Sequence, residues 1–435
     1  MPEALYPEMK RQRKQDFLTY LPSQIITSIL SSLPIRTIVQ YKCVCKQWLH
    51  LLETDEFVRS HLAISVPTLA VLTPTWKPCP NSISESEYGE RTRSLPVILQ
   101  RDSSLCIVFE FEDDQNLERH DHHFSPLTNF DFPHSAEIKG SANGLLFLSK
   151  PRSEAHSEDH YVCNPITREY VEVRCPKELV HLFPNQFTCP EVELFFPRYP
   201  QPATYGFGAS KITGQHKVVR IFHGRVTAPG GRRIVPIFEC HVHTLGTGSW
   251  RRVESSAPFQ YSTDATCVFL NGNLHWIVSD AVSDLWISCF DLETERFSIF
   301  PTPLLYEECD ALIVGLSVLG DCLCLCYHTE EDETVIWLMK EYGVDESWTR
   351  EYVFNIKEYP NIEGSSSICP IKVFKDGDIL MSLDDGDELI YYSNKTQTAH
   401  EISLSGVVDG ELYSILFTPS FLSLKSLKME NVISF

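Results

Sequence analysis

The chain has 435 residues, 43% of them hydrophobic, so it can bury a large core and exceeds the usual size of one domain unless much of it is a repeat array. Its 37 basic and 58 acidic residues give a formal net charge of −21, which argues against a nucleic acid as the main partner. No apolar run approaches the roughly 20 residues that span a bilayer, and the fifteen cysteines fit reduced, buried thiols. We therefore expect a soluble intracellular protein of the cytoplasm, the nucleus or both, with no membrane partner.

Helical periodicity dominates the first part of the chain. After a tail at residues 1–16 that we expect to be disordered, apolar residues recur at helical spacing from Leu21. Pro34 ends the first helix, and the periodicity restarts at Ile35 and again before Trp48, which predicts three short helices. Three such helices cannot bury all this apolar surface among themselves. Part of it should contact another protein or the rest of the same chain.

Ordered motifs in this region resemble an F-box at residues 17–62. They are two Leu-Pro pairs, the block CVCKQW ending at Trp48, and FVRSHL from Phe57 to Leu62. The resemblance implies docking on a Skp-type adaptor, which links the chain to a cullin-RING ubiquitin ligase. The matching positions are Leu21, Pro22, Ile25, Ile29, Leu33, Pro34, Ile38, Val39, Cys43, Val44 and Trp48.

The remainder of the chain reads as short β-strands separated by turn residues. A seven-residue phrase recurs as NPITREY (164–170), TLGTGSW (244–250), DLETERF (291–297) and, more weakly, SNKTQTA (393–399), and a longer turn ends at Trp348. From Trp250 onward the phrase ends lie about 50 residues apart, which is typical of four-stranded propeller blades. A proline-laden insertion, 176–202, explains the longer first interval.

Segments of this body resemble the kelch-like, F-box-associated interaction domain of plant F-box proteins. They include SANGLLFL (141–148), LNGNLHW (270–276) and FTPSFLSLKS (417–426). We expect a small all-α F-box followed by an all-β propeller over residues 63–425 and a tail at 426–435. Six blades are expected, with seven as the alternative, and the strand near Tyr413 to Phe417 should close the ring on a blade built from residues 66–111.

Candidate metal and catalytic groups have simpler explanations. Cys322, Cys324 and Cys326 alternate along one strand and cannot easily converge on one tetrahedral ion, so they should be core. The histidines at 120, 122 and 123, the pair His241 and His243, and the acidic clusters at 110–114, 330–333 and 384–388 fit solvated loops or half-buried strands. Hydrolase, Walker and metalloprotease motifs are missing from the sequence. We expect neither catalysis nor a cofactor.

The sequence thus predicts a non-catalytic substrate receptor of a ubiquitin ligase. Two alternatives stay open, namely an F-box scaffold that delivers no substrate, and a propeller enzyme with carboxylates in its channel. The residues that bind the target are unknown. Loops at 176–202 and 224–236 are our candidates, because propellers vary in their connecting loops.

Overall fold

The computed structural model of the chain describes most of its length. The described residues are 22–41, 46–78, 99–112, 123–151, 159–176, 203–227, 234–254, 260–261, 267–280, 284–303, 314–329, 333–355, 368–383, 388–402, 404 and 412–434. The chain separates into two compact units, Met1–Ser65 and Val66–Phe435. Each unit is considered by itself, and the expected disordered tail at 1–16 lies outside the described residues.

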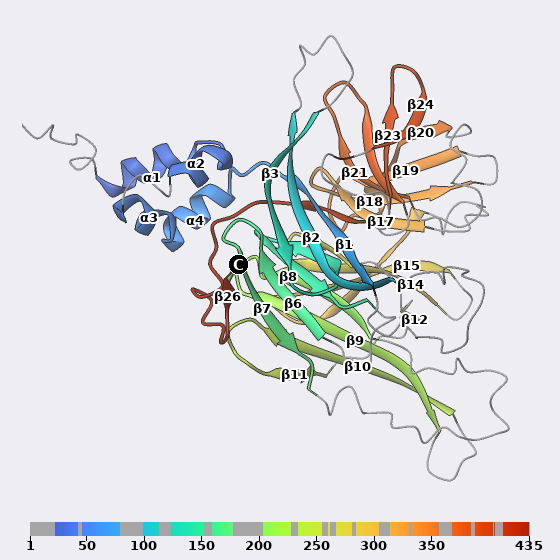
Figure 1. The fold of residues 1–435 in the computed structure, drawn as a ribbon. Helices are drawn as coiled ribbons and strands as arrows, with labels where there is room; N and C mark the ends of the chain where they lie inside the picture. Colours follow the sequence, from blue (N-terminus) through green and yellow to red (C-terminus); the bar gives the residue numbers. More distant parts are fainter. Residues whose placement is uncertain are drawn as a thin grey trace, which may run out of the picture. The chain divides into compact units, whose positions relative to one another are not determined.

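The first unit is a small helical domain (Figure 1). Its helices are α1 (Ser23–Ser31), α2 (Ile35–Tyr41), α3 (Lys46–Leu52) and α4 (Asp55–Leu62). Three helices were expected in this region, and four are found because Thr54 starts a separate one. The Thr54 hydroxyl accepts a hydrogen bond from the amide of Phe57 at 3.2 Å, which satisfies a free donor at the start of α4.

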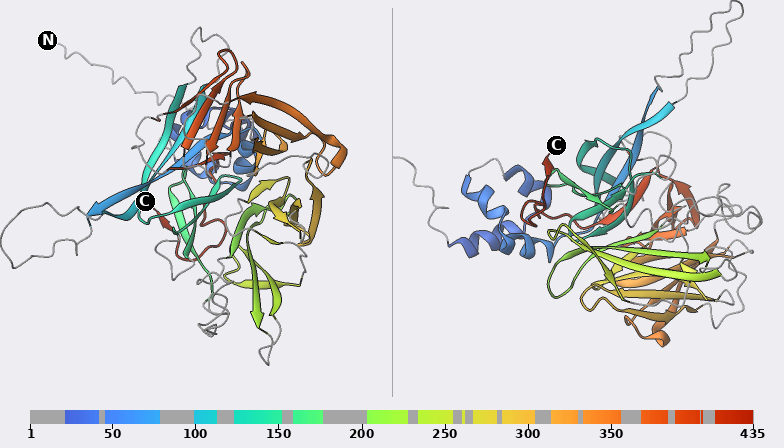
Figure 2. Two further views of the ribbon diagram at one scale, coloured as in Figure 1. Left: turned by 90° about the vertical axis from the view of Figure 1, so that its right-hand side faces the viewer. Right: turned by 90° about the horizontal axis from the view of Figure 1, so that it is seen from below.

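The second unit is an all-β propeller, as expected. In the described part of the chain six antiparallel sheets succeed one another around a common centre, which confirms six blades (Figure 2). Blade 1 holds β1 (Thr68–Pro78), β2 (Leu99–Glu112), β3 (His123–Phe132) and β25 (Tyr413–Phe417). Blade 2 holds β4 (Glu137–Ala142), β5 (Leu145–Ser149), β6 (Asp159–Asn164), β7 (Glu169–Arg174) and β26 (Ile433–Ser434).

The other four blades use consecutive strands. Blade 3 holds β8 (Thr204–Ala209), β9 (His216–Thr227), β10 (Ile234–Thr244) and β11 (Trp250–Val253). Blade 4 holds β12 (Gln260–Tyr261), β13 (Val268–Leu270), β14 (Asn273–Ser279), β15 (Leu285–Asp291) and β16 (Phe297–Pro301). Blade 5 holds β17 (Val314–Leu319), β18 (Cys322–His328), β19 (Glu333–Met339) and β20 (Trp348–Asn355). Blade 6 holds β21 (Ile368–Val373), β22 (Ile379–Leu383), β23 (Glu388–Ser393) and β24 (Thr398–Glu401).

The ring closes where the sequence predicts. Strand β25 pairs with β1 in antiparallel register, with Thr68 opposite Phe417 and Leu72 opposite Tyr413. Blade 1 is therefore completed by a strand from the far end of the chain, as in other closed propellers that leave no open edge between first and last blades.

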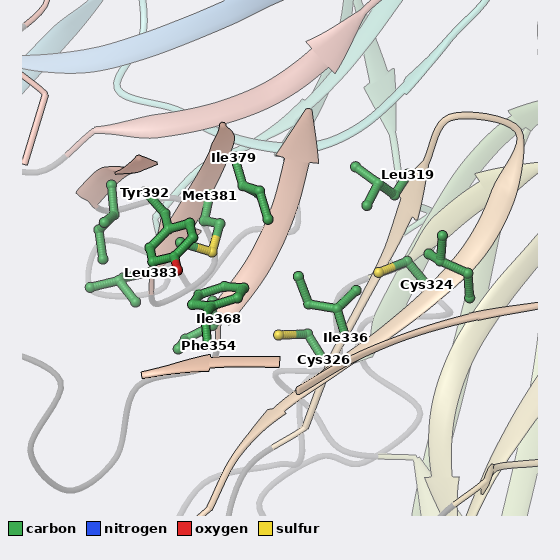
Figure 3. Packing of buried hydrophobic residues seen from close by; sticks show 12 residues of the cluster. Leu319, Cys324, Cys326, Ile336, Phe354, Ile368, Ile379, Met381, Leu383 and Tyr392 are labelled. Carbon is green, nitrogen blue, oxygen red and sulfur yellow. The ribbon is translucent and has the colours of Figure 1, made fainter. Parts of the chain in front are cut away.

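Side chains packed between neighbouring blades form the core. Figure 3 shows the cluster between blades 5 and 6, where Cys324 and Cys326 lie beside Ile336 and Met381. Both thiols are fully buried, and burial raises their pKa. The expectation that these cysteines are core residues is confirmed. Each sheet buries its faces only against its neighbours, as expected for a repeat architecture.

The recurring seven-residue phrase forms the turn before the last strand of a blade. Its fifth residue has a positive φ in all four copies, namely Arg168 (58°), Gly248 (70°), Glu295 (57°) and Gln397 (59°). The side chains of Asn164 and Asp291, which open two of the copies, accept hydrogen bonds from the amide two residues further on, at 2.8 Å and 2.7 Å. In these two copies an Asx-type turn leads into the left-handed residue, whereas Thr244 and Ser393 open the other two copies.

The two faces of the propeller differ in their connections. One face, the short-turn face, carries turns within blades, including Asn143-Gly144 and Asn271-Gly272, both with the expected positive φ. The ends of β1, β7, β16 and β20 lie on the opposite face, called the long-connection face. Thr68, where the chain enters the propeller, lies on the short-turn face beside the end of β25.

The C-terminal residues pack on the propeller. Beyond β25 the chain continues across blade 2 and ends in β26, where Ile433 pairs with Tyr170 of β7. Residues 418–434, here called the strap, bury Phe421 and Leu424 against the propeller. The segment expected as a tail at 426–435 includes β26, which is the fifth strand of blade 2.

Candidate adaptor-binding site

Helix α1 presents apolar side chains to the surface of the helical domain. Ile25 is 46% exposed and Ile29 is 51% exposed, and the two lie one turn apart on the same face of the helix. Val39 of α2 is 38% exposed. Large aliphatic side chains at this exposure lose hydrophobic free energy unless a partner covers them. The exposed group, Ile25, Ile29 and Val39, is called the apolar stripe below.

The rest of the helical domain packs inward. Leu30, Ile38, Leu52 and Phe57 are at most 2% exposed and form its core. His61 of α4 stacks on Phe57 with ring centroids 5.9 Å apart, and burial lowers the pKa of this histidine. A small core that includes the buried His61 holds α1 in place, so the stripe is displayed on a folded surface.

The predicted adaptor-binding residues separate into exposed, half-buried and buried groups. Pro22 and Pro34 are exposed together with the stripe, whereas Leu33 and Trp48 are half-buried. Ile38 is fully buried, so it can support the surface but cannot itself contact a partner in this conformation. Leu21, Cys43 and Val44 lie outside the described residues.

The candidate residues of the propeller are the two loops, the histidines and the acidic clusters. Of the loop expected at 224–236, residues 224–227 and 234–236 are paired strands of β9 and β10, so that part of the expectation is wrong. The other candidate loop, 176–202, is described only at Pro176. His241 and His243 are buried, not half-buried, and burial lowers the pKa of each. Of the expected acidic clusters and the histidines at 120–123, only residues 110–112, 123, 333 and 388 fall within the described chain.

Two further properties hold for the described residues. No cluster of three or more His, Cys, Asp or Glu side chains that could hold a metal ion occurs among them. Within the same ranges, no helix is long and apolar enough to cross a membrane.

Sequence reasoning missed the residues that hold the strap. Asn164 and Glu169 are the first and sixth residues of the phrase in blade 2, and both are buried. Glu169 accepts hydrogen bonds from the hydroxyl of Ser423 and the amide of Leu424, each at 2.8 Å. In the sequence, the only hint of this role is that Asn164 and Glu169 are polar, because the turn by itself does not require them to bind a distant segment.

Along the chain, a helical domain with an exposed apolar stripe is followed by a six-bladed propeller. The sequence matches the F-box domain family over residues 18–60 and the family described as "F-box associated beta propeller domain" over residues 96–424. The chain belongs to the F-box proteins that carry an F-box-associated β-propeller. Membership indicates a substrate-adaptor function in Skp-cullin-F-box complexes.

The chain is also similar to F-box proteins of Arabidopsis thaliana. The chain is 26% identical to F-box protein At3g07870 over 90% of this chain and 87% of that protein. It is 25% identical to F-box protein CPR1 over 82% of this chain and 78% of that protein. F-box/kelch-repeat protein At3g23880 is 21% identical over 76% of this chain and 78% of its own length.

Proposed function

We propose that the chain is the substrate-recognition subunit of a ubiquitin ligase of the Skp-cullin-F-box type. The helical domain binds a Skp-type adaptor, and the propeller holds a protein that is then ubiquitinated and degraded. The supporting observation is the apolar stripe, because Ile25 and Ile29 are half exposed although the domain buries Leu30, Ile38, Leu52 and Phe57 in its core. Such a patch on so small a domain is explained by a partner.

The chain itself supplies no chemistry in this proposal. Ubiquitin transfer takes place on other subunits, and the receptor accelerates it by holding the target close to the activated ubiquitin. Tethering of this kind replaces a bimolecular encounter with a high effective concentration. The rigid propeller fixes the target, and the stripe fixes the ligase.

Adaptor binding tests the first half of the proposal. The double variant Ile25→Ala, Ile29→Ala removes exposed side chains only, so the chain should still fold. Because the two isoleucines are about half exposed, covering the rest of them in an interface is worth roughly 1.5 to 3 kcal/mol, and we expect affinity for a purified Skp-type adaptor to fall roughly tenfold to hundredfold. Isothermal titration calorimetry measures this directly.

Exposed isoleucines elsewhere provide a matched control. Ile64 is 55% exposed and Ile212 is 80% exposed, so Ile64→Ala, Ile212→Ala removes the same atoms from other surfaces. Adaptor affinity should be unchanged in this variant. Loss of binding in both doubles, or in neither, would remove the assignment of the stripe. Target ubiquitination by the reconstituted ligase then separates a receptor from a scaffold.

A further inference from the structure

The outermost strand of each blade has one edge that faces away from the sheet. Such an edge exposes main-chain N–H and C=O groups, and proteins usually protect it with a proline, a charged side chain, a bulge or a covering segment. In five of the six blades the described outer strand has one of these features. They are Pro126 in β3, the covering strand β26 in blade 2, Arg251 and Arg252 in β11, the bulge at Glu351 in β20, and Glu401 in β24.

Strand β16 of blade 4 is the least protected of the described outer strands. Its sequence is Phe-Ser-Ile-Phe-Pro, so it carries no charged side chain, and its one proline, Pro301, is the last residue. Its pairing with β15 is regular from Phe297 to Pro301, without a bulge. Among the described residues β16 pairs with β15 alone. The outer edge of residues 297–301 is called the open edge below.

The hydrogen-bond pattern shows which main-chain groups of β16 point outward. The amide of Asp291 donates to the carbonyl of Arg296 at 3.0 Å, and hydrogen-bonded pairs recur at every second residue of an antiparallel ladder. Phe297 and Ile299 therefore direct their main-chain N–H and C=O groups away from β15. Another extended backbone is the partner that matches donors and acceptors at this two-residue spacing.

Apolar side chains flank the open edge on both faces of the sheet. Phe297 is half-buried toward blade 3, with its ring centroid 5.7 Å from that of Phe238. Ile299, two residues further on, lies on the same face and is also half-buried. Phe300 is half-buried toward blade 5, with its ring centroid 5.9 Å from that of Tyr342. A strand added to β16 would cover this apolar surface in addition to pairing with the main chain.

A cavity lies beside the open edge, at the rim between blades 3 and 4. It measures about 310 Å³ and is lined by Phe238, Arg252, Val253 and Glu254. Phe238 and Val253 pack with Phe297 against the core between these two blades. The two charged residues of the lining have opposite signs, so the cavity selects neither an acidic nor a basic group. A volume at the lower limit of ligand sites fits a single apolar side chain resting on Phe238 and Val253.

The propeller already contains one added outer strand. In blade 2, β26 pairs with β7, with Ile433 opposite Tyr170 and Ser434 opposite Glu169. This strand comes from the C-terminal end of the chain, so it is a segment distant in sequence from the blade that it extends. An extra strand at the outer edge is therefore compatible with the geometry of a blade.

We propose that the open edge of blade 4 binds an extended segment of the target protein, which adds to β16 as a further outer strand. The inference rests on the proposed function and names the kind of target segment. Residues opposite Phe297 and Ile299 lie on the face toward blade 3, and the residue opposite Ser298 lies on the other face. The segment therefore has the pattern apolar, polar, apolar, and one of its apolar side chains enters the cavity. Main-chain hydrogen bonds supply affinity, and the side-chain pattern supplies specificity.

Peptide binding to the full-length chain tests this directly. The probe is the fluorescein-labelled peptide Gly-Ser-Val-Thr-Val-Thr-Val-Ser-Gly, called the valine peptide. One control peptide carries N-methyl groups on the three valines, which removes the donors that would face β16, and the other has serine in place of valine. Fluorescence anisotropy is recorded at 50 and 300 mM NaCl. We expect the valine peptide alone to bind, with the same affinity at both salt concentrations because no ion pair is involved.

A proline on the open edge locates the site. Ile299→Pro removes an outward N–H without removing a hydrogen bond to β15, so blade 4 should keep its pairing. We expect affinity for the valine peptide to fall at least roughly tenfold. The matched control is Ala399→Pro in β24, which also faces outward because the amide of Ile402 donates to the carbonyl of Leu389. This control should bind the peptide as the wild type does, and equal losses in the two variants would overturn the proposal.

A second variant tests the cavity without changing β16. Val253→Phe fills the cavity from its wall, and affinity for the valine peptide should fall roughly tenfold because a buried apolar side chain loses its place. Urea unfolding is measured for every variant. If Ile299→Pro proves unfolded, Val253→Phe decides, and unchanged affinity in that variant would overturn the proposal.

Pairing of the open edge with a second copy of the chain is the competing occupant. Size-exclusion chromatography with light scattering measures the oligomeric state of the wild type and of Ile299→Pro. A wild-type dimer that Ile299→Pro converts to a monomer would overturn the assignment to a target segment. Absence of valine-peptide binding, or equal binding of the N-methylated peptide, would overturn it as well.

Adaptor affinity is measured on the same samples. Loss of peptide binding with intact adaptor binding contradicts this inference alone, whereas intact peptide binding without adaptor binding contradicts the proposed function.

Discussion

The side-chain amide of Asn164 donates hydrogen bonds to the main-chain carbonyl of Leu422 at 2.7 Å and to that of Ser420 at 3.0 Å. Asn164 is fully buried at the turn of blade 2, and its partners lie more than 250 residues away in the strap. The Asn164 side chain therefore has two roles: its nitrogen binds the strap, and its oxygen accepts a hydrogen bond within the local turn. The strap is fastened to the propeller by polar contacts as well as by Leu424.

Removing the Asn164 side chain should loosen this fastening. Asn164→Ala leaves two buried carbonyls and a turn amide without their partner, which costs roughly 2 to 4 kcal/mol. We expect a matching fall in the free energy of unfolding in urea. Asn129 is exposed on β3, so Asn129→Ala should change stability by less than about 0.5 kcal/mol. Equal stability of the two variants would show that the strap does not need Asn164.

Ring closure can be tested by truncation at two positions. A chain that ends at residue 411 lacks β25 and the strap, so blade 1 loses its closing strand and the fully buried Phe417. We expect it to be insoluble or to unfold without a cooperative transition. A chain that ends at residue 431 loses only β26, whose residues Ile433 and Ser434 are exposed, and its melting temperature should fall by only a few degrees. A cooperative transition in the shorter chain would argue against closure through β25.

The repeat pattern predicts the propeller well because it comes from local physics. A turn that leads into a left-handed residue leaves a similar mark in blades 2, 3, 4 and 6, and Asn164, Asp291 and Glu295 show it. The pairing of β25 with β1 was predictable because a six-bladed ring needs a strand that the first blade does not supply locally. Both inferences depend on spacing alone.

Other features depend on contacts between distant residues, which spacing does not encode. The burial of Ile38 beside the exposed Val39 follows from how α2 rests on its neighbours, and both residues look alike in the helical pattern. The strap has no periodicity of its own, so the sequence predicts a tail from residue 426 onward. The uncharged run of β16 is present in the sequence, but it becomes meaningful only when its place at the edge of blade 4 is known.

Glycines on the inner strands let neighbouring blades approach closely. A Cβ placed on Gly315 of β17 would lie 2.4 Å from the main-chain oxygen of Ile368 in blade 6 and 2.9 Å from the sulfur of Cys369. Because a main-chain atom cannot move aside locally, Gly315→Ala should cost about 3 kcal/mol or prevent folding. Urea unfolding followed by tryptophan fluorescence measures the change.

Gly214 provides the control for this prediction. Its φ is +69°, and nothing lies within 4 Å of an added Cβ, so Gly214→Ala tests backbone strain without crowding. The expected cost is about 1 kcal/mol. If Gly315→Ala were no more destabilising than Gly214→Ala, close approach of blades 5 and 6 would not be the reason for a glycine on β17.

Acid should destabilise the propeller through buried neutral histidines. Burial lowers the pKa of His216 from 6.5 to about 4, and that of His275 likewise to about 4. Between these values the unfolded chain binds a proton that the folded chain excludes, so stability falls as pH drops from 6.5 towards 4 and levels off below it. Each histidine contributes up to about 3 kcal/mol to this loss.

Substituting one of these histidines measures its contribution to the loss of stability in acid. His216 stacks on Phe207 with ring centroids 5.8 Å apart, so His216→Phe keeps an aromatic ring in the same buried place and removes the titrating group. The free energy of unfolding, measured in urea at pH 7.5 and pH 4.5, should fall less steeply with acid in this variant than in the wild type. His400 is exposed on β24, and His400→Phe should retain the full acid sensitivity. If His216→Phe and the wild type lost the same amount of unfolding free energy between pH 7.5 and pH 4.5, His216 would not be the cause, because phenylalanine cannot titrate. Protonation of carboxylates elsewhere would then explain the loss.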